Sequence, residues 1–322
     1  MIKIKSYLSL IKFAHTIFAL PFAMIGFFIP ASSLIRAFIK FSDPNENFPC
    51  FPEENTGAFR LIVFDEGTPH SFTELFVRMG LIILCMVFAR SAAMAFNRYL
   101  DKNFDSKNPR TAIREIPSGI LKANNVLLFT VINCLLFIAC TFFINKLCFY
   151  LSPVALAVVL GYSYTKRFTP LCHLILGLGL SLAPIGAYIA VTNQFSLLPV
   201  VFSIIVLFWV SGFDIIYALQ DEEFDKQNKL YSIPAVLGKK NALVVSRALH
   251  FISASSVVFA GWLGSFGLWY WIGAAFFITL LIYQHTLVKP NDLKKVNLAF
   301  FTTNGIASVV FAIFVIADLF VN

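Results

Sequence analysis

A polar segment near position 100 carries three oxygen-bearing side chains at four-residue intervals, Asn97, Asp101 and Asp105. Residues four apart lie one turn above each other on an α-helix, so this spacing predicts a single face lined with amide and carboxylate oxygens. Oxygen ligands at this density are typical of sites for hard cations such as Mg²⁺, whereas zinc prefers nitrogen and sulfur. The segment is therefore a candidate metal-binding face.

A second acidic group lies in the C-terminal half of the chain. Asp214, Asp221 and Asp225 are spaced i, i+7 and i+11, which predicts one face of a continuous helix, with Tyr217 on the same stretch. Carboxylates that face each other repel unless a cation lies between them. If the two groups pack together, they favour a shared Mg²⁺ site.

Basic side chains occur close to both acidic groups. Mg²⁺ usually keeps several waters and bridges one or two carboxylates to substrate phosphates. Lysine and arginine can bind the remaining phosphate oxygens, and arginine can do so with two parallel hydrogen bonds. The combination predicts a diphosphate-binding site. The basic residues concerned are Lys102, Arg110, Arg114, Lys166 and Arg167.

The elements that must position these residues are membrane spans. Of the 322 residues, 58% are hydrophobic and 13% charged, whereas globular proteins average about 25% charged. This composition excludes a soluble enzyme, a disordered protein and an ordinary nucleic-acid-binding protein. We predict an all-α polytopic membrane protein, a single domain over residues 1–322, with nine transmembrane helices. The predicted spans are 10–29, 76–97, 123–144, 147–164, 173–192, 196–219, 242–262, 267–288 and 297–320.

The distribution of basic residues predicts the orientation in the membrane. If the sides alternate, 19 of the 25 Lys and Arg residues fall on the side of the N-terminus, four on the other side and two inside the second span. Cytoplasmic loops carry such an excess, so we predict a cytoplasmic N-terminus and an external C-terminus. Both acidic groups then lie at the cytoplasmic side. Residues 31–75, acidic and rich in proline, are predicted to form an outer-face loop insertion.

Two charged residues are predicted to lie inside spans. Asp214 is about two turns from the end of its span, and Arg90 lies seven residues before Asn97 on a compatible face. Ionisable groups within a bilayer are costly and usually functional, so Arg90 is expected to pair with an anion, either a carboxylate or a phosphate. For either acidic group alone, helix capping or a solvated surface is an adequate explanation. Capping or solvation is a weaker explanation for two acidic groups with similar spacing on the same side of the membrane.

Together, the two acidic groups resemble the aspartate-rich motifs of the UbiA superfamily of intramembrane prenyltransferases. The resemblance covers nearly the whole chain outside the 31–75 insertion and includes the nine-helix count. Asn228 and Lys229 occupy positions where the family often has glycine, a departure that concerns the loop and not the ligands. The matching motifs are Asn97-xxx-Asp101-xxx-Asp105, Asn108-Pro-Arg110-Thr111, Tyr162-Ser-Tyr164-Thr-Lys166-Arg167, Asp221-xxx-Asp225 and Ser232-Ile-Pro234.

Residues 12–22, 89–92 and 212–221 resemble more narrowly the 4-hydroxybenzoate polyprenyltransferase-like branch, which serves bacterial quinone biosynthesis. This resemblance implies Mg²⁺-dependent transfer of a polyprenyl group from polyprenyl diphosphate to the ring of an aromatic acid, in ubiquinone or menaquinone biosynthesis. It also implies a multi-pass protein of the bacterial cytoplasmic (inner) membrane, with its active site at the cytoplasmic side. The partners are then the two substrates and the lipid bilayer, with no nucleic acid.

The resemblance also implies roles for individual residues. Arg90 is expected to bind the carboxylate of the acceptor, while Asp214 and Tyr217 position the acceptor or face the allylic cation. The implied Mg²⁺ ligands are Asn97, Asp101, Asp105, Asp221 and Asp225, whose aspartates, with Asp214 and Tyr217, are the candidate catalytic residues. The implied diphosphate-binding residues are Arg98, Lys102, Arg110, Lys166 and Arg167.

Several alternatives stay open at this point. One alternative within the same enzyme class is a prenyltransferase with another acceptor: dihydroxynaphthoate, a futalosine-route intermediate or haem. From a different class, a membrane transporter also uses intramembrane aspartate and arginine. Transporters usually have paired halves and broken helices near the midplane, and no repeat is visible in this sequence.

Overall fold

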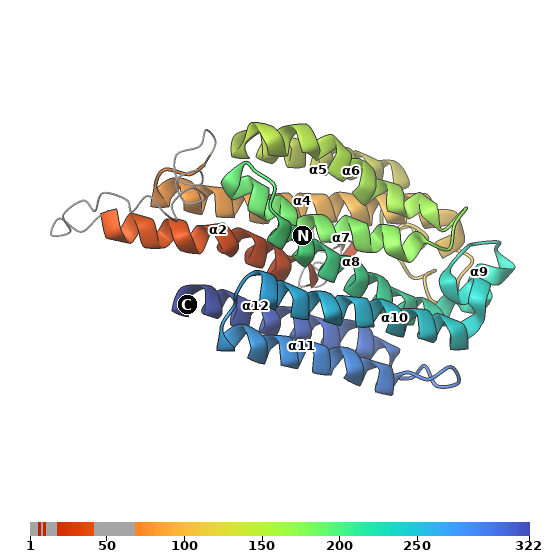
Figure 1. The fold of residues 1–322 in the computed structure, drawn as a ribbon. Helices are drawn as coiled ribbons and strands as arrows, with labels where there is room; N and C mark the ends of the chain where they lie inside the picture. The colour runs from red at the N-terminus through yellow and green to blue at the C-terminus, as the bar shows by residue number, and fades with distance from the viewer. Residues whose placement is uncertain (1–5, 8, 11–17, 42–67) are drawn as a thin grey trace.

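A computed structural model describes residues 6–7, 9–10, 18–41 and 68–322. Within these ranges the regular secondary structure is helical, and turns and one isolated bridge between Lys289 and Asp292 lie between the helices. Nine helices of the described residues are long and apolar enough to cross a membrane, and they run along a common direction (Figure 1). The predicted all-α class and the number of spans are confirmed.

Most helices begin and end within a few residues of the predicted spans. Three elements have special geometry: a 3₁₀ turn (η2), a π-helical turn (η3), and a kink in α10, where Gly238 has a φ of 76° that suits glycine. The elements are α2 (Leu20–Phe41), α4 (Phe72–Asp105), α5 (Ala123–Ile144), α6 (Lys146–Thr165), α7 (Cys172–Thr192), α8 (Leu197–Ala218), η2 (Leu219–Asp221), α9 (Glu222–Gln227), α10 (Ile233–Leu263), α11 (Leu268–Leu287), η3 (Leu298–Thr303) and α12 (Asn304–Val321).

The predicted boundary at residue 29 is wrong, because α2 continues to Phe41. Leu34 remains fully buried on this extension, and the Arg36 guanidinium donates to the carbonyl of Leu319, so apolar packing and a charged anchor both extend the helix. The predicted loop over 31–75 is therefore shorter at both ends, since α4 begins at Phe72. Residues 42–67 of that loop, like residues 11–17 of the first predicted span, lie outside the described ranges.

The two acidic groups are carried differently from each other. The first lies on the unbroken helix α4, as predicted from its spacing. The prediction of a continuous helix over 214–225 is wrong: α8 ends at Ala218, and the 3₁₀ turn η2 separates it from α9. The Gln220 amide donates to the carbonyl of Tyr217 (3.2 Å), a side-chain bond that competes with the regular helical pattern. The acidic residues after this turn start a new, short helix.

Helix α7 lies in the middle of the bundle and packs closely against α2 and α8. A Cβ atom on Gly26 of α2 would lie 2.0 Å from the carbonyl oxygen of Pro184, and one on Gly177 would lie 2.4 Å from that of Leu207. Small residues permit such close backbone approach between membrane helices. The start of α7 is thereby held against the end of α8, where the second acidic group begins.

Aromatic side chains fill the space between α2, α8, α11 and α12. The ring of the fully buried Trp209 lies 5.3 Å from that of Phe22, 5.1 Å from Phe213 and 5.6 Å from Phe277. The Trp209 indole N–H donates to Asn304 Oδ1 (2.9 Å), which satisfies the polar atom of this large side chain. This core makes the C-terminal helices a rigid support for α8.

A buried carboxylate caps the start of α11 at the end of the bundle opposite α9. Asp318 is 1% exposed, and its Oδ2 accepts a hydrogen bond from the Gly267 N–H at 2.8 Å. Its Oδ1 accepts from the Tyr270 N–H at 3.1 Å and from the Asn322 amide at 3.0 Å. The first N–H groups of a helix have no partner within the helix, so Asp318 satisfies groups that would otherwise be buried without one.

We expect Asp318→Ala to destabilise the protein by about 1–3 kcal/mol, because it leaves buried N–H groups without an acceptor. The measurement is the midpoint of thermal unfolding in detergent micelles. The exposed Asp292, substituted by alanine, is the matched control and should leave the midpoint unchanged. Equal midpoints for both variants would show that Asp318 does not stabilise α11.

Candidate active site

A pocket of about 280 Å³ opens where the C-terminal ends of α4, α6 and α8 meet the N-terminal ends of α7 and α10. It lies at the end of the bundle that carries α9, opposite the C-terminus (Figure 1). The structure brings 11 of the 13 predicted site residues together in its wall, and the exceptions are Lys102 and Arg167. The predicted residues in the wall are Arg90, Asn97, Arg98, Asp101, Asp105, Arg110, Lys166, Asp214, Tyr217, Asp221 and Asp225.

Asp101 is the member of the first acidic group that has two cationic partners. It is 3% exposed, and its carboxylate lies 3.7 Å from Lys166 Nζ and 3.4 Å from Arg167 Nη2. Asn97 donates its amide N–H to Asp101 Oδ2 at 3.4 Å, so these two predicted ligands lie next to each other. Arg167 is not in the pocket wall but contacts two residues that are, Asp101 and the ring of Phe104. Lys102 points elsewhere and lies 4.5 Å above the ring of Tyr99.

Asp105 has one paired and one unpaired oxygen. Its Oδ1 lies 2.6 Å from Nη1 of Arg114, in a salt bridge across the turn that follows α4. Its Oδ2 is buried and has no hydrogen-bond partner in the part of the chain that the structure describes. A buried carboxylate oxygen without a partner is costly, so Oδ2 is the atom in this group that is open to a ligand.

Arg110 joins the turn after α4 to the second acidic group. Its guanidinium makes a bidentate ion pair with Asp221, with Nε to Oδ1 at 3.1 Å, and Nη1 donates to the Tyr217 hydroxyl at 3.0 Å. Asn108 adds a second contact from the same turn, since its amide donates to Asp221 Oδ1 at 3.3 Å. Partial burial lowers the pKa of Arg110, but the contacts with Asp221 and Tyr217 together raise it by more. The net shift of the Arg110 pKa is upward, so the group stays cationic.

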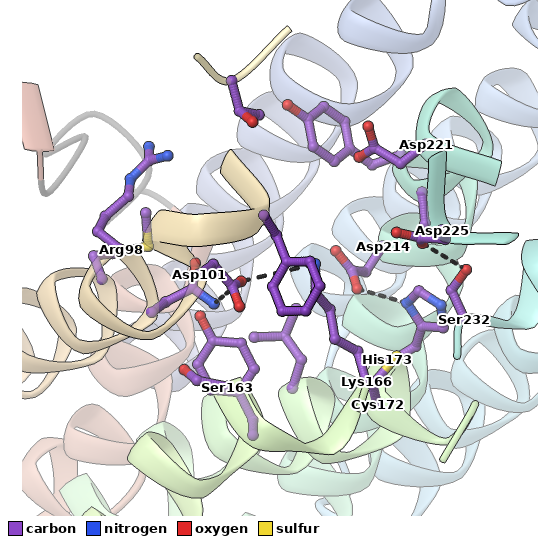
Figure 2. A pocket seen from close by; sticks show the side chains of 18 of the residues that line it. Arg98, Asp101, Ser163, Lys166, Cys172, His173, Asp214, Asp221, Asp225 and Ser232 are labelled. Atoms are coloured by element: carbon purple, nitrogen blue, oxygen red, sulfur yellow. Dashed lines mark hydrogen bonds and ion pairs between the residues drawn. The ribbon is translucent and has the colours of Figure 1, made fainter. Parts of the chain in front are cut away.

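The other two aspartates of the second group are held by side chains from α7 and α10 (Figure 2). Asp225 is 5% exposed and accepts a hydrogen bond from Ser232 Oγ at 2.9 Å. Asp214 Oδ2 lies 2.7 Å from Nδ1 of His173. His173 was not assigned to the site from the sequence, because it lies 41 residues from Asp214 and belongs to no spaced motif.

Two arginines of α4 have buried guanidinium nitrogens that are not fully hydrogen-bonded. Arg98 is 4% exposed, and its Nε and Nη1 have no partner among the described residues; the same is true of Nε of Arg90. A buried guanidinium without a counter-ion is destabilising, so these two side chains mark places where an anionic ligand is favoured. Arg90 lies deeper along α4 than Arg98, further from the end of the helix.

The charges in the wall of the pocket balance. Because the pocket already contains as many cations as carboxylates, a diphosphate adds uncompensated negative charge unless a metal cation enters with it. No three His, Cys, Asp or Glu side chains of the described residues converge as a metal site on their own. Mg²⁺ needs only one or two carboxylates beside water and phosphate, so the residues fit a metal shared with a phosphate ligand. The charged wall residues are Asp101, Asp105, Asp214, Asp221, Asp225, Arg90, Arg98, Arg110, Arg114 and Lys166.

A second cavity of about 380 Å³ adjoins the pocket and extends between α4, α5, α6 and α7. Its wall is mostly apolar, with Phe137 and Phe195 among the lining side chains. The two cavities have a common border formed by Arg90, Met94, Tyr162, Leu176 and Leu180. The site therefore has a charged compartment at the end of the bundle and an apolar compartment inside it.

Comparison with known proteins gives concordant matches. Residues 64–306 match the model of the UbiA prenyltransferase family. A 4-hydroxybenzoate octaprenyltransferase of Aeromonas salmonicida (strain A449) is 29% identical over 245 residues, which cover 76% of this chain and 83% of that protein. A protein of the same description from Francisella tularensis subsp. holarctica (strain LVS) is 26% identical over 256 residues, covering 80% of this chain and 88% of that protein.

Solved structures share the fold. A UbiA homolog from Aeropyrum pernix K1 in its apo form aligns with a TM-score of 0.70 and 26% identity, covering 95% of this chain and 97% of that one. A UbiA homolog from Archaeoglobus fulgidus bound to DMAPP and Mg²⁺ aligns with a TM-score of 0.69 and 17% identity, covering 98% and 100%. The arrangement of helices is thus that of these proteins.

The charge balance predicts that Mg²⁺ and inorganic diphosphate together stabilise the folded protein more than either does alone. At 100 times the dissociation constant, bound ligand adds about 2.7 kcal/mol, which is measurable as a rise in the thermal unfolding midpoint. Asp105→Asn and Asp225→Asn should abolish this rise, because each removes a carboxylate next to the ligand. Asp292→Asn is the control, and a rise that survives in both pocket variants would contradict the assignment.

Proposed function

The chain belongs to the UbiA prenyltransferase family, and from this membership and the chemistry of its pocket we propose that it transfers a polyprenyl group from polyprenyl diphosphate to the ring of an aromatic acid such as 4-hydroxybenzoate. One observation carries the proposal. Two acidic groups and their cations share a charge-balanced pocket that borders an apolar cavity within the membrane bundle. A polyprenyl diphosphate has a head and a tail that match these two compartments.

The diphosphate binds in the charged compartment. Arg110 and Lys166 donate to its oxygens, Arg110 from the turn after α4 and Lys166 from the end of α6. Bound Mg²⁺ would neutralise the charge that develops on the leaving diphosphate. The Archaeoglobus fulgidus protein of the same fold, which was solved with DMAPP and Mg²⁺, supports this reading. The residues that would hold the metal are Asn97, Asp101, Asp105, Asp221 and Asp225.

The polyprenyl tail binds in the apolar compartment. The cavity between α4 and α7 removes the chain from water, a gain of about 25 cal/mol for each Å² of apolar surface. Its position within the bundle also keeps water from the allylic carbon, which matters because an allylic cation would otherwise be hydrolysed. The relatives described as octaprenyltransferases support a long donor chain.

The acceptor binds where the two compartments meet. Arg90 belongs to the walls of both, so its guanidinium can pair with the carboxylate of an aromatic acid placed at the border. The C–O bond of the donor breaks and its electron pair leaves with the diphosphate. A ring π pair then forms the new C–C bond, and the displaced ring proton passes to Asp214, whose carboxylate also faces the pocket.

Quinone biosynthesis in a bacterial cytoplasmic membrane is the setting that this reaction suggests. The excess of Lys and Arg supports an N-terminus and a pocket on the cytoplasmic side. The pairing expected of Arg90 supports an acidic acceptor over haem. The aspartates gather at one end of the bundle, which supports a transferase over a transporter with a site at the midplane.

A prenyl-transfer assay tests the proposal directly. Membranes containing the protein are incubated with labelled polyprenyl diphosphate, Mg²⁺ and a panel of aromatic acids. We expect a prenylated acid whose formation needs the metal and falls at least about 100-fold in Asp101→Ala and in Asp221→Ala, because each variant removes a carboxylate of the metal and diphosphate site.

The outcomes of this assay differ in meaning. Transfer that persists in both variants would leave the reaction correct but refute the roles of Asp101 and Asp221. The absence of transfer to any aromatic acid, with folded wild-type protein, would refute the proposed acceptor class. The exposed Asp292→Ala is the control for expression and membrane insertion.

The apolar compartment can be tested by filling it. Gly186 lines the cavity, and a Cβ atom there would have open space within 4 Å. We expect Gly186→Phe to lower kcat/KM for a long polyprenyl donor by about tenfold or more while sparing a short geranyl donor. Gly80 is also surrounded by open space but lies outside the cavity, so Gly80→Phe is the matched control. An equal loss with both donors would argue against the tail assignment.

A further inference from the structure

His173 lies between three helices at the wall of the pocket. It is 3% exposed and belongs to the first turn of α7 (Figure 2). Its Nδ1 is 2.7 Å from Asp214 Oδ2 on α8, and its Nε2 is 3.3 Å from the backbone nitrogen of Ile233 at the start of α10. Both ring nitrogens therefore have a defined partner.

These two partners fix the position of the ring proton. The backbone N–H of Ile233 can only donate, so Nε2 must accept and carries a lone pair. The proton of the neutral imidazole is then on Nδ1, which donates to Asp214 Oδ2. A hydrogen bond donated to a carboxylate stabilises its ionised form. The other oxygen of Asp214, Oδ1, has no hydrogen-bond partner among the described residues.

The surroundings of His173 keep this geometry rigid. The hydroxyl of Ser211 donates to the backbone carbonyl of His173 at 3.1 Å, and Ser211 lies one turn before Asp214 on α8. Gly177, one turn further along α7, leaves no room between α7 and α8. The imidazole and the carboxylate are thus held by two helices that cannot slide past each other.

The start of α10, which contacts His173, also contacts Asp225 of the second acidic group. Ser232, directly before Ile233, donates to Asp225 and also caps the first turn of α10 by accepting from the Ala235 N–H at 3.3 Å. The start of α10 therefore contacts His173 through its backbone and Asp225 through a side chain. A single rigid turn sets the position of both aspartates.

We propose that His173 is a positioning residue for the acceptor half of the reaction, an inference that rests on the proposed prenyl transfer. By donating from Nδ1, it holds Asp214 ionised, with Oδ2 occupied and Oδ1 available to the ring. When the new C–C bond has formed, Oδ1 takes the displaced ring proton, and the C–H electron pair restores the aromatic ring. The proton then passes to water, so the protein returns to its starting state.

The test compares His173→Leu, which has no donor, with His173→Asn, whose amide nitrogen can occupy the place of Nδ1. The readouts are kcat, KM for each substrate, and the ratio of diphosphate released to prenylated product. We expect His173→Leu to lower kcat for ring transfer about 100-fold while KM for polyprenyl diphosphate changes by less than about twofold. Diphosphate release should then exceed product formation, because water captures the allylic cation.

The conservative variant separates positioning from packing. His173→Asn should recover kcat to within about tenfold of the wild type and restore the ratio of diphosphate to product to near one. His285→Leu, a matched change at a histidine outside the pocket wall, should leave that ratio unchanged.

Three results would overturn the inference. The first is an unchanged kcat in His173→Leu. The second is an equal loss in His173→Leu and His173→Asn at the same thermal stability. The third is a change confined to KM for polyprenyl diphosphate, which would place the effect of His173 on diphosphate binding. Wild-type protein that prenylates no aromatic acid would refute the proposed function itself, and the inference with it.

Discussion

The structure depends on the neutralisation of carboxylates that lie close together at the end of a membrane bundle. Three motif aspartates have cationic partners: Arg110 for Asp221, Arg114 for Asp105, and Lys166 with Arg167 for Asp101. Without these cations, repulsion between partly buried carboxylates would drive the helix ends apart. The turn after α4 is therefore part of the fold as well as part of the site, because its arginine ties α4 to α8.

The direction of the helices adds to this balance. Helices α4 and α8 point their C-terminal ends at the pocket, where the partial negative charge of a helix makes further acidic residues unfavourable. Helices α7 and α10 point their N-terminal ends at the same place and provide partial positive charge. The cations and these helix starts together let the pocket hold several carboxylates. A metal cation that enters with an anionic ligand then offsets most of the negative charge that the ligand adds to the pocket.

The sequence predicted those parts of the molecule that repeat along the chain. Apolar runs of span length predicted the nine helices, and the four-residue spacing of Asn97, Asp101 and Asp105 predicted their common face on α4. The same rule failed at Asp221 and Asp225, because a side-chain bond from Gln220 favours a 3₁₀ turn there. Both aspartates still line the pocket, since their polarity, and not a continuous helix, keeps them at the end of the bundle.

Contacts between distant segments could not be read in this way. Arg98 and Lys102 are one turn apart on α4, yet only Arg98 lines the pocket, while Lys102 covers the ring of Tyr99. His173 has a role in the site only because α7 packs against α8 and α10, and no spacing within its own segment reports that packing. Sequence spacing therefore identifies residues that share one helix face, whereas the partners that orient them follow from how the helices pack.

The border between the two compartments accounts for the position of the proposed reaction. A donor with a charged head and an apolar tail is most stable when the change in polarity along the molecule coincides with the change in its surroundings. That border is formed by Arg90, Tyr162 and three apolar side chains, so solvation alone brings the bond between head and tail to the level of Arg90. A single guanidinium at the same level can hold an acidic acceptor beside it. In the proposed reaction, the polarity of the two cavities therefore sets the position of the reacting carbon of the donor. The charge of Arg90 selects the acceptor that lies next to this carbon.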